Sequence, residues 1–272
     1  MSTLIGILLA TILILVGMIM KGGSIAGIIN IPAFLMVVGG TMGVLIASFG
    51  MKPALGTFKL FLGQAIKERP ERRPELVNEL VGLSEKARRE GLLVLEEDAK
   101  RLDDPFLGKG VRLVVDGADP ELVKDVLETE LDAMEERHRF NQDIFKQGGA
   151  FAPTIGILAT VLSLVGVLQH LDDPDSLGPS ISAAFLATFY GVFAANIVFM
   201  PIANALKKKT ALEVGERMLI IEGVLSIQNG DNPRVLADKL WSFLPPELRA
   251  QEGAEGAGAD APAGAAAAAE PA

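Results

Sequence analysis

The 272-residue chain contains no cysteine, two histidines and one tryptophan, and each shortage excludes a class of site. Without cysteine there can be neither disulfide bonds nor thiolate metal ligands, and two histidines are too few for a histidine-rich metal site. The formal net charge of −9 argues against binding to nucleic acid, which requires a basic face. We find no constellation of nucleophile and base, so the sequence predicts neither an enzyme nor a bound metal or cofactor.

Charge is also missing from four long apolar stretches. They cover residues 3–20, 31–49, 149–168 and 180–203, and no Lys, Arg, Asp, Glu or His lies across their centres. Half of the residues are hydrophobic and the mean hydropathy is +0.37, which is typical of a polytopic membrane protein. Each stretch is near the ~20 residues that a helix needs to cross the membrane. We therefore predict four transmembrane helices in two pairs, rather than helices buried in a soluble core.

The distribution of basic residues predicts the orientation of these helices. Lysines follow the second and fourth stretches, whereas the loop after the first stretch holds only Lys21 and the loop after the third holds neither Lys nor Arg. The lysines concerned are Lys52, Lys59, Lys67, Lys207, Lys208 and Lys209. Because basic loops stay in the cytoplasm, we expect both termini and the central block to be cytoplasmic.

The rest of the chain has helical signals and no strand pattern, so we predict an all-α fold. Pro74 and Pro120 are typical of helix starts, and the helix from Pro120 meets no breaker before Gly148, so it should continue into the third span. We expect another helix at 209–228 and a short one after Asn232. The predicted organisation is membrane helices at 1–50, a cytoplasmic helical domain at 51–147, membrane helices at 148–204, cytoplasmic helices at 205–250 and a disordered tail at 251–272.

A dense group of charges lies in the central block. Arg88 and Arg89 precede a helix break at Gly91, and Glu96 and Glu97 follow it. Such a group is either a solvated surface, with salt bridges worth well under ~1 kcal/mol each, or a docking face that orients a charged partner. The pattern alone leaves both interpretations open.

Several segments together resemble a known family. Two pairs of spans carry GGSIAGIINIPAFLMVVGGT, ARREGLLVLEED, FAPTIGILATVLSLVGVL, ATFYGVFAANIVFMPIANAL and EGVLSIQNGDNPRVLADKL in this order. This resembles the flagellar motor stator A subunits, the MotA/PomA family of the MotA/TolQ/ExbB proton channel superfamily, over about residues 1–250. The resemblance implies a multi-pass protein of the bacterial inner membrane, surrounded by lipid, in a ring of five A subunits around two B subunits. Each B subunit would supply one transmembrane helix with an Asp and a peptidoglycan-binding domain.

The resemblance also implies roles for particular residues. Arg88 and Glu96 match the base and acid that contact the rotor's switch ring, and Arg89 and Glu97 are adjacent members of that set. This favours the docking interpretation of the charged block. Ion flow would turn the A ring about the B pair, and the charges would pass the motion to the rotor.

Two prolines match family positions linked to ion flow, Pro153 in the third span and Pro201 near the cytoplasmic end of the fourth. Each proline removes a backbone donor and kinks its helix, which leaves a carbonyl free; the alternative is a packing kink. Thr154 and Thr188 could line the path beside the partner's Asp, or bond back to their own helices.

Other functions remain as alternatives. The coupling ion is H⁺ or Na⁺, and we favour H⁺. An energiser of envelope transport similar to TolQ or ExbB would have three spans in a different layout. A small-solute transporter would need polar groups at the midplane or inverted repeats, and we find neither.

Overall fold

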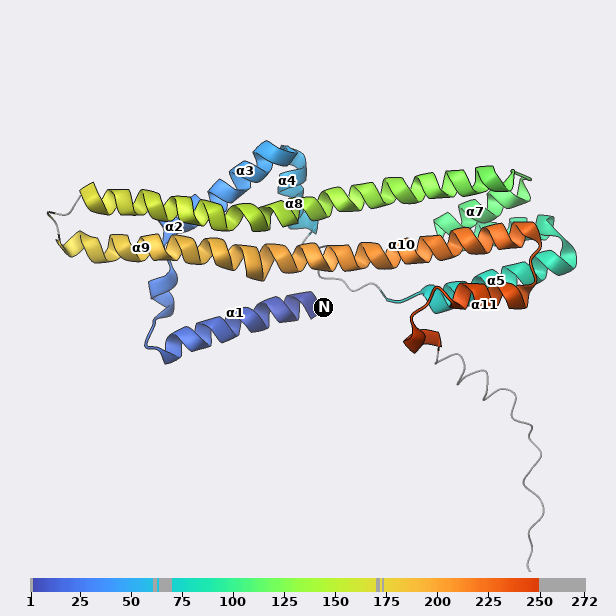
Figure 1. The fold of residues 1–272 in the computed structure, drawn as a ribbon, viewed down its shortest axis with the longest axis horizontal. Helices are drawn as coiled ribbons and strands as arrows, with labels where there is room; N and C mark the ends of the chain where they lie inside the picture. Colours follow the sequence, from blue (N-terminus) through green and yellow to red (C-terminus); the bar gives the residue numbers. More distant parts are fainter. Residues whose placement is uncertain (1, 61–62, 64–69, 170–171, 173, 250–272) are drawn as a thin grey trace, which may run out of the picture. The chain divides into compact units, whose positions relative to one another are not determined.

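The structure is a computed structural model that describes residues 2–60, 63, 70–169, 172 and 174–249. All elements in these ranges are helical, which confirms the all-α prediction (Figure 1). Four helices are long and apolar enough to cross a membrane: Ser2–Met20, Ile31–Phe49, Pro120–Gln169 and Leu177–Asn229. The four predicted spans lie within them. The tail predicted at 251–272 lies outside the described residues.

The chain divides into two compact units, of which the first comprises Met1–Pro70 and Ala133–Ala211. It contains the membrane-spanning segments. Its elements are α1 (Ser2–Met20), the 3₁₀ turn η1 (Ile25–Ile28), α2 (Ile31–Phe34), the π-turn η2 (Leu35–Gly39), α3 (Gly40–Phe49), α4 (Met51–Leu60), the C-terminal part of α8 (Pro120–Gln169), α9 (Pro174–Phe193), the π-turn η5 (Ala194–Phe199) and the start of α10 (Met200–Asn229).

Within this unit α8 and α9 lie side by side at backbone contact (Figure 1). A Cβ atom placed on Gly191 would lie 2.5 Å from the carbonyl oxygen of Ala152, and one placed on Gly156 would lie 2.9 Å from that of Ala187. Small residues permit such close approach of membrane helices. The two glycines therefore set the separation of α8 and α9 and bring their polar groups within reach of each other.

The loop between the first and second spans is fastened by the chain's only tyrosine. The hydroxyl of Tyr190, on α9, accepts a hydrogen bond from the backbone N–H of Asn30 at 3.0 Å and donates one to the carbonyl of Ile28. Its ring also meets Phe34 edge to face at 6.0 Å between centroids. These contacts hold η1 and the start of α2 against α9.

The second unit comprises Glu71–Asp132 and the chain from Leu212 onward. It contains α5 (Arg73–Glu90), the 3₁₀ turn η4 (Leu92–Val94), α6 (Leu95–Arg101), α7 (Pro105–Val115), the start of α8, the end of α10 and α11 (Pro233–Trp241). Its core is built from fully buried side chains of five helices: Leu76, Leu80, Phe106, Leu107, Leu127, Leu219, Ile220, Leu236 and Leu240. The guanidinium of Arg217 covers the ring of Phe106 at 4.3 Å. This small helical core positions the charged residues of α5 and α6.

Helix limits follow the signals in the sequence, with one difference. The helix from Pro120 does continue into the third span, as predicted, and Asn232 caps α11 by accepting a hydrogen bond from the N–H of Arg234 at 3.0 Å. The helix expected at 209–228, however, is not a separate element but the continuation of the fourth span within α10. The run of lysines at 207–209 contains neither Gly nor Pro, and a change from apolar to charged residues does not end a helix.

Candidate functional site

The charged group of the sequence lies at the junction of α5 and α6. Helix α5 ends at Glu90, and Gly91 follows with φ 88° and ψ 163°, a conformation that is open essentially only to glycine. The chain then forms η4 and the seven-residue α6. The turn at Gly91 thus places the bases that end α5 and the acids that begin α6 on consecutive elements.

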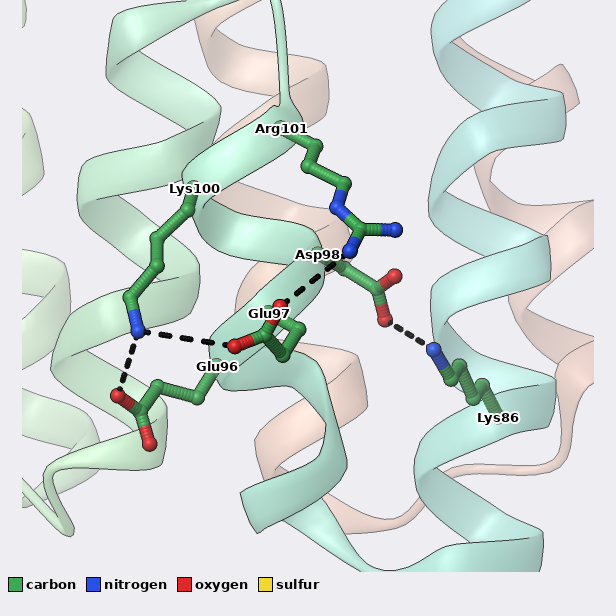
Figure 2. A network of polar contacts seen from close by, with 6 residues as sticks. All are labelled: Lys86, Glu96, Glu97, Asp98, Lys100 and Arg101. Carbon is green, nitrogen blue, oxygen red and sulfur yellow. Dashed lines mark hydrogen bonds and ion pairs between the residues drawn. The ribbon is translucent and has the colours of Figure 1, made fainter.

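The predicted rotor-contacting residues are all exposed, but the bases and acids differ in their partners. Glu96 accepts a charge-assisted hydrogen bond from Lys100 at 2.9 Å, and Glu97 accepts one from Arg101 at 3.3 Å (Figure 2). Both glutamates keep more than half of their side-chain surface in solvent. Within the described part of the chain, Arg88 and Arg89 have no ion-pair partner. The face therefore offers free cations beside carboxylates that are already paired.

A further ion pair joins the two helices themselves. Lys86 Nζ, on α5, lies 2.7 Å from Asp98 Oδ2, on α6, and the two side chains retain 35% and 25% of their surface (Figure 2). The same two residues line a cleft of about 370 Å³ between α5 and α6. Among the pairs of Figure 2, this one alone connects different helices.

Local electrostatics shift the pKa of two groups beside this face. The hydrogen bond from Lys100 to Glu96 raises the pKa of the Lys100 ammonium. Burial raises the pKa of the Glu79 carboxyl, the nearby Asp104 and Asp103 add to the rise, and Arg72 opposes it. Glu79 lines the same cleft as Lys86 and Asp98.

The predicted ion-pathway residues lie on α8, α9 and α10 in the first unit. Pro153 lies inside the continuous helix α8, where it removes the N–H that would bond the carbonyl of Gly149. The next residue, Thr154, is exposed, and its hydroxyl donates to the carbonyl of Phe151 at 2.8 Å. This is the bond back to its own helix that the sequence left open, and the hydroxyl oxygen keeps acceptor capacity.

Thr188 pairs across the helix interface. Its hydroxyl lies 2.6 Å from that of Thr160, on α8, which in turn lies 2.8 Å from the carbonyl of Ala184. These polar contacts connect α8 and α9 within the span, next to the close contact at Gly191. Thr160 was not among the predicted site residues, because nothing in the sequence shows which hydroxyls face one another.

Pro201 is the second residue of α10, which follows the π-turn η5 directly. Pro201, Asn196 of the π-turn and Lys208 line an open groove of about 500 Å³ along α1. The amide of Asn196 donates to the carbonyl of Val192 at 3.0 Å. Single π-turns inside α-helices are frequent at functional sites. Asn196 was not among the predicted site residues, since a lone amide in an apolar run carries no motif.

Comparison with known proteins decides which family has this arrangement. Residues 98–218 match the model of the MotA/TolQ/ExbB proton channel family. Motility protein A of Bacillus subtilis is 39% identical over 91% of this chain and 92% of its own length. The chain belongs to the MotA/PomA family of flagellar motor stator A subunits. It is therefore a multi-pass protein of the inner membrane, in a family of stator channel subunits that is not known for enzymes.

Solved stator structures agree with the fold. The flagellar MotAB stator complex from Bacillus subtilis matches with a TM-score of 0.84 at 38% identity, covering 92% of this chain and 99% of that chain. The structure of C. jejuni MotAB matches with a TM-score of 0.84 at 31% identity, covering 90% and 96%. Within the MotA/PomA fold, the charged group thus lies in the helical segment between the second and third spans, and the prolines and threonines lie in the third and fourth.

Proposed function

We propose that this stator A subunit couples H⁺ flow to torque on the rotor, together with a B-type partner that carries the ion-binding Asp. The solved relatives are MotAB complexes, which supports a B partner and an oligomeric A ring. Five A subunits around two B subunits remain the stoichiometry that the family resemblance implies. The four spans and the match over nine-tenths of the chain favour this function over that of a TolQ- or ExbB-like energiser.

The observation that carries the torque proposal is the imbalance of partners on the charged face. Arg88 and Arg89 are exposed cations that form no ion pair with any residue the structure describes, and they can attract acidic groups of the rotor's switch ring. Glu96 and Glu97 are held by solvent-exposed i,i+4 pairs, which are weak because water screens them, so a partner's base can displace Lys100 or Arg101 at little cost. A face with both properties suits repeated binding and release.

The proposed ion path runs along spans that carry no ionisable side chain at their centres. Pro153 leaves a carbonyl without its helical donor, and the Thr154 hydroxyl beside it keeps acceptor capacity for water or an ion. Thr188 and Pro201 lie on the neighbouring helix. In this mechanism the partner's Asp is neutralised from outside, the A ring steps past these groups, and the ion leaves inward. H⁺ is preferred because hydroxyls and water can relay it.

The topology follows from the same lysines. Lys207, Lys208 and Lys209 on α10 and Lys52 on α4 follow membrane spans, which supports cytoplasmic termini and a cytoplasmic location for residues 51–147 and 205–250. The rotor-contacting unit then lies on the side where the switch ring is found.

Charge reversal tests the docking face. An Arg88→Glu, Glu96→Lys double variant should lose most of its motility, because the rotor would meet like charges at both positions. Membrane insertion and assembly with the B partner should be unchanged, since both side chains are exposed. Swimming speed and the amount of the protein in the membrane are measured side by side, and normal motility of the double variant would contradict the proposal.

The coupling ion is tested by measuring motility in sodium-free medium. If motility stops there while the proton gradient is intact, the coupling ion is Na⁺ and not H⁺.

A further inference from the structure

The orientation of α6 depends on few contacts. The helix has seven residues, and Leu95 and Ala99 are its only buried side chains, so it cannot be stable by itself. On one side α7 approaches closely: a Cβ on Gly108 would lie 3.1 Å from the carbonyl oxygen of Ala99. On the other side the ion pair of Lys86 and Asp98 reaches α5 across the cleft. Rotation of α6 about its axis is opposed by these two contacts.

That rotation decides where the acids of the docking face point. Successive residues of a helix are ~100° apart, so Glu96, Glu97 and Asp98 point in three different directions. Asp98 is directed at Lys86, whereas Glu96 lies on the opposite side of α6 and Glu97 between the two (Figure 2). Both glutamates are exposed. If Asp98 were released, α6 would lose its ion pair to α5, and the packing of Leu95 and Ala99 would be left to oppose a rotation that brings Glu96 or Glu97 towards Arg88 or Arg89.

We propose that the ion pair of Lys86 and Asp98 is a positioning clamp, which holds the acidic helix α6 at a fixed rotation so that its glutamates and the arginines of α5 face the rotor together. This inference rests on the proposed function. It adds two residues to the site that do not themselves touch the rotor, and it assigns them a role in specificity: the clamp keeps the opposite charges of the face from neutralising each other.

The geometric part of the proposal is tested without the rotor. Because the chain has no native cysteine, spin labels on Arg88→Cys and Glu96→Cys report the distance between α5 and α6 in the purified complex with the B partner. Asp98→Asn should at least double the width of the distance distribution. A distribution as narrow as that of the parent would overturn the clamp, whatever the rotor does.

The functional part uses charge exchange with a matched control. Lys86→Asp and Asp98→Lys should each lower stall torque several-fold, and the double exchange should restore at least half of it, while ion leak through the complex and its melting temperature stay near the parent values. The control is the pair of Lys109 and Glu130 between α7 and α8, which has the same 2.7 Å separation and similar exposure but includes no residue of α6. Its exchange variants, Lys109→Glu and Glu130→Lys, should keep normal torque.

The possible outcomes separate the two proposals. Loss of torque in the Arg88→Glu, Glu96→Lys variant together with normal torque in both single exchange variants would sink the clamp alone. Single variants that lose torque and are not rescued by the double exchange would also contradict it. Normal torque in Arg88→Glu, Glu96→Lys would instead remove the proposed docking face, and the spin-label result would still decide whether the clamp exists.

Discussion

At the level of single residues, two threonines of the third span make different kinds of hydrogen bond. Thr160 contacts α9 across the helix interface as well as the carbonyl of Gly156 on its own helix, whereas the hydroxyl of Thr154 donates to its own helix. Thr160→Val should therefore lower the free energy of unfolding by roughly 0.6–1.7 kcal/mol, the range for bonds between membrane helices. Thr154→Val should leave stability unchanged and reduce ion flow instead. Thermal unfolding and proton flux of both variants provide the check, and equal stability losses would contradict the distinction.

Glu79 provides a second prediction at this scale, on pH dependence. Because its pKa is raised in the folded protein, folding binds the proton more tightly, and the ionised carboxylate opposes folding at pH above the folded pKa. Glu79→Gln should therefore raise the melting temperature at neutral pH, and the difference should shrink as the pH falls towards the carboxyl range. Fluorescence of Trp241, on α11 in the same unit, follows the transition. A loss of stability at neutral pH would show that Glu79 has a stabilising partner.

The sequence indicates which residues belong to the candidate site more clearly than it indicates which of them form pairs. Arg88, Arg89, Glu96 and Glu97 were found from sequence because a two-sign cluster and a family motif coincide there. The pairs of Glu96 with Lys100 and of Glu97 with Arg101 follow the i,i+4 rule and were available in the same segment. The ion pair of Lys86 and Asp98 between α5 and α6 was not, since it depends on how the two helices pack after the turn at Gly91.

At the level of elements, the contact between α8 and α9 depends on glycine. Gly191→Ala would place a Cβ 2.5 Å from the carbonyl oxygen of Ala152, so the helices would have to separate. We expect a loss of about 1–3 kcal/mol in stability, as in other overpacked interiors, together with loss of motility. Gly178→Ala, on the same helix, has no atom within 4 Å of the new Cβ and should behave like the parent. Unfolding in detergent and swarming assays compare the two; similar behaviour would argue that the helices lie further apart.

Elements could be predicted from the sequence where the composition of a segment reveals them. The spans agree closely with the structure because length and apolarity alone define them, and Pro120 marks a helix start by its chemistry. The sequence predicts a helix boundary after the fourth span because the residues there change from apolar to charged. No residue at that point breaks a helix, and the span continues through α10. The π-turns were missed as well, since their hydrogen-bond pattern leaves no trace in hydropathy.

At the level of the whole molecule, the membrane helices contain no ionisable group at their centres and their apolar surface is largely uncovered. None of the residues of α1 is buried within the chain, and Ile5, Leu9 and Leu13 each expose more than half of their surface. In a membrane such a surface contacts lipid or neighbouring subunits. The exposed surface of α1 is thus available to lipid and to further subunits.

It follows that the chain alone should not conduct. Vesicles that contain only this subunit should show background proton flux, and flux should appear when the B partner is added with its peptidoglycan-binding domain released. A partner whose membrane Asp is replaced by Asn should restore assembly but not flux, because no carboxylate would remain in the path. Substantial flux through the chain by itself would require an ionisable group that its spans do not contain.

The π-turn of the fourth span also divides that helix into two registers. A π-turn closes its hydrogen bond one residue later than an α-turn, so residues after it are displaced by about one position, or ~100°, from a wheel drawn through α9. Thr188 and Pro201 lie on opposite sides of this turn. Loss of one residue between 194 and 199 would restore a single wheel and keep the helix, yet it would turn Pro201 and everything beyond it to a different face. In this helix, the direction in which a side chain points depends on the number of residues before it as much as on their identity.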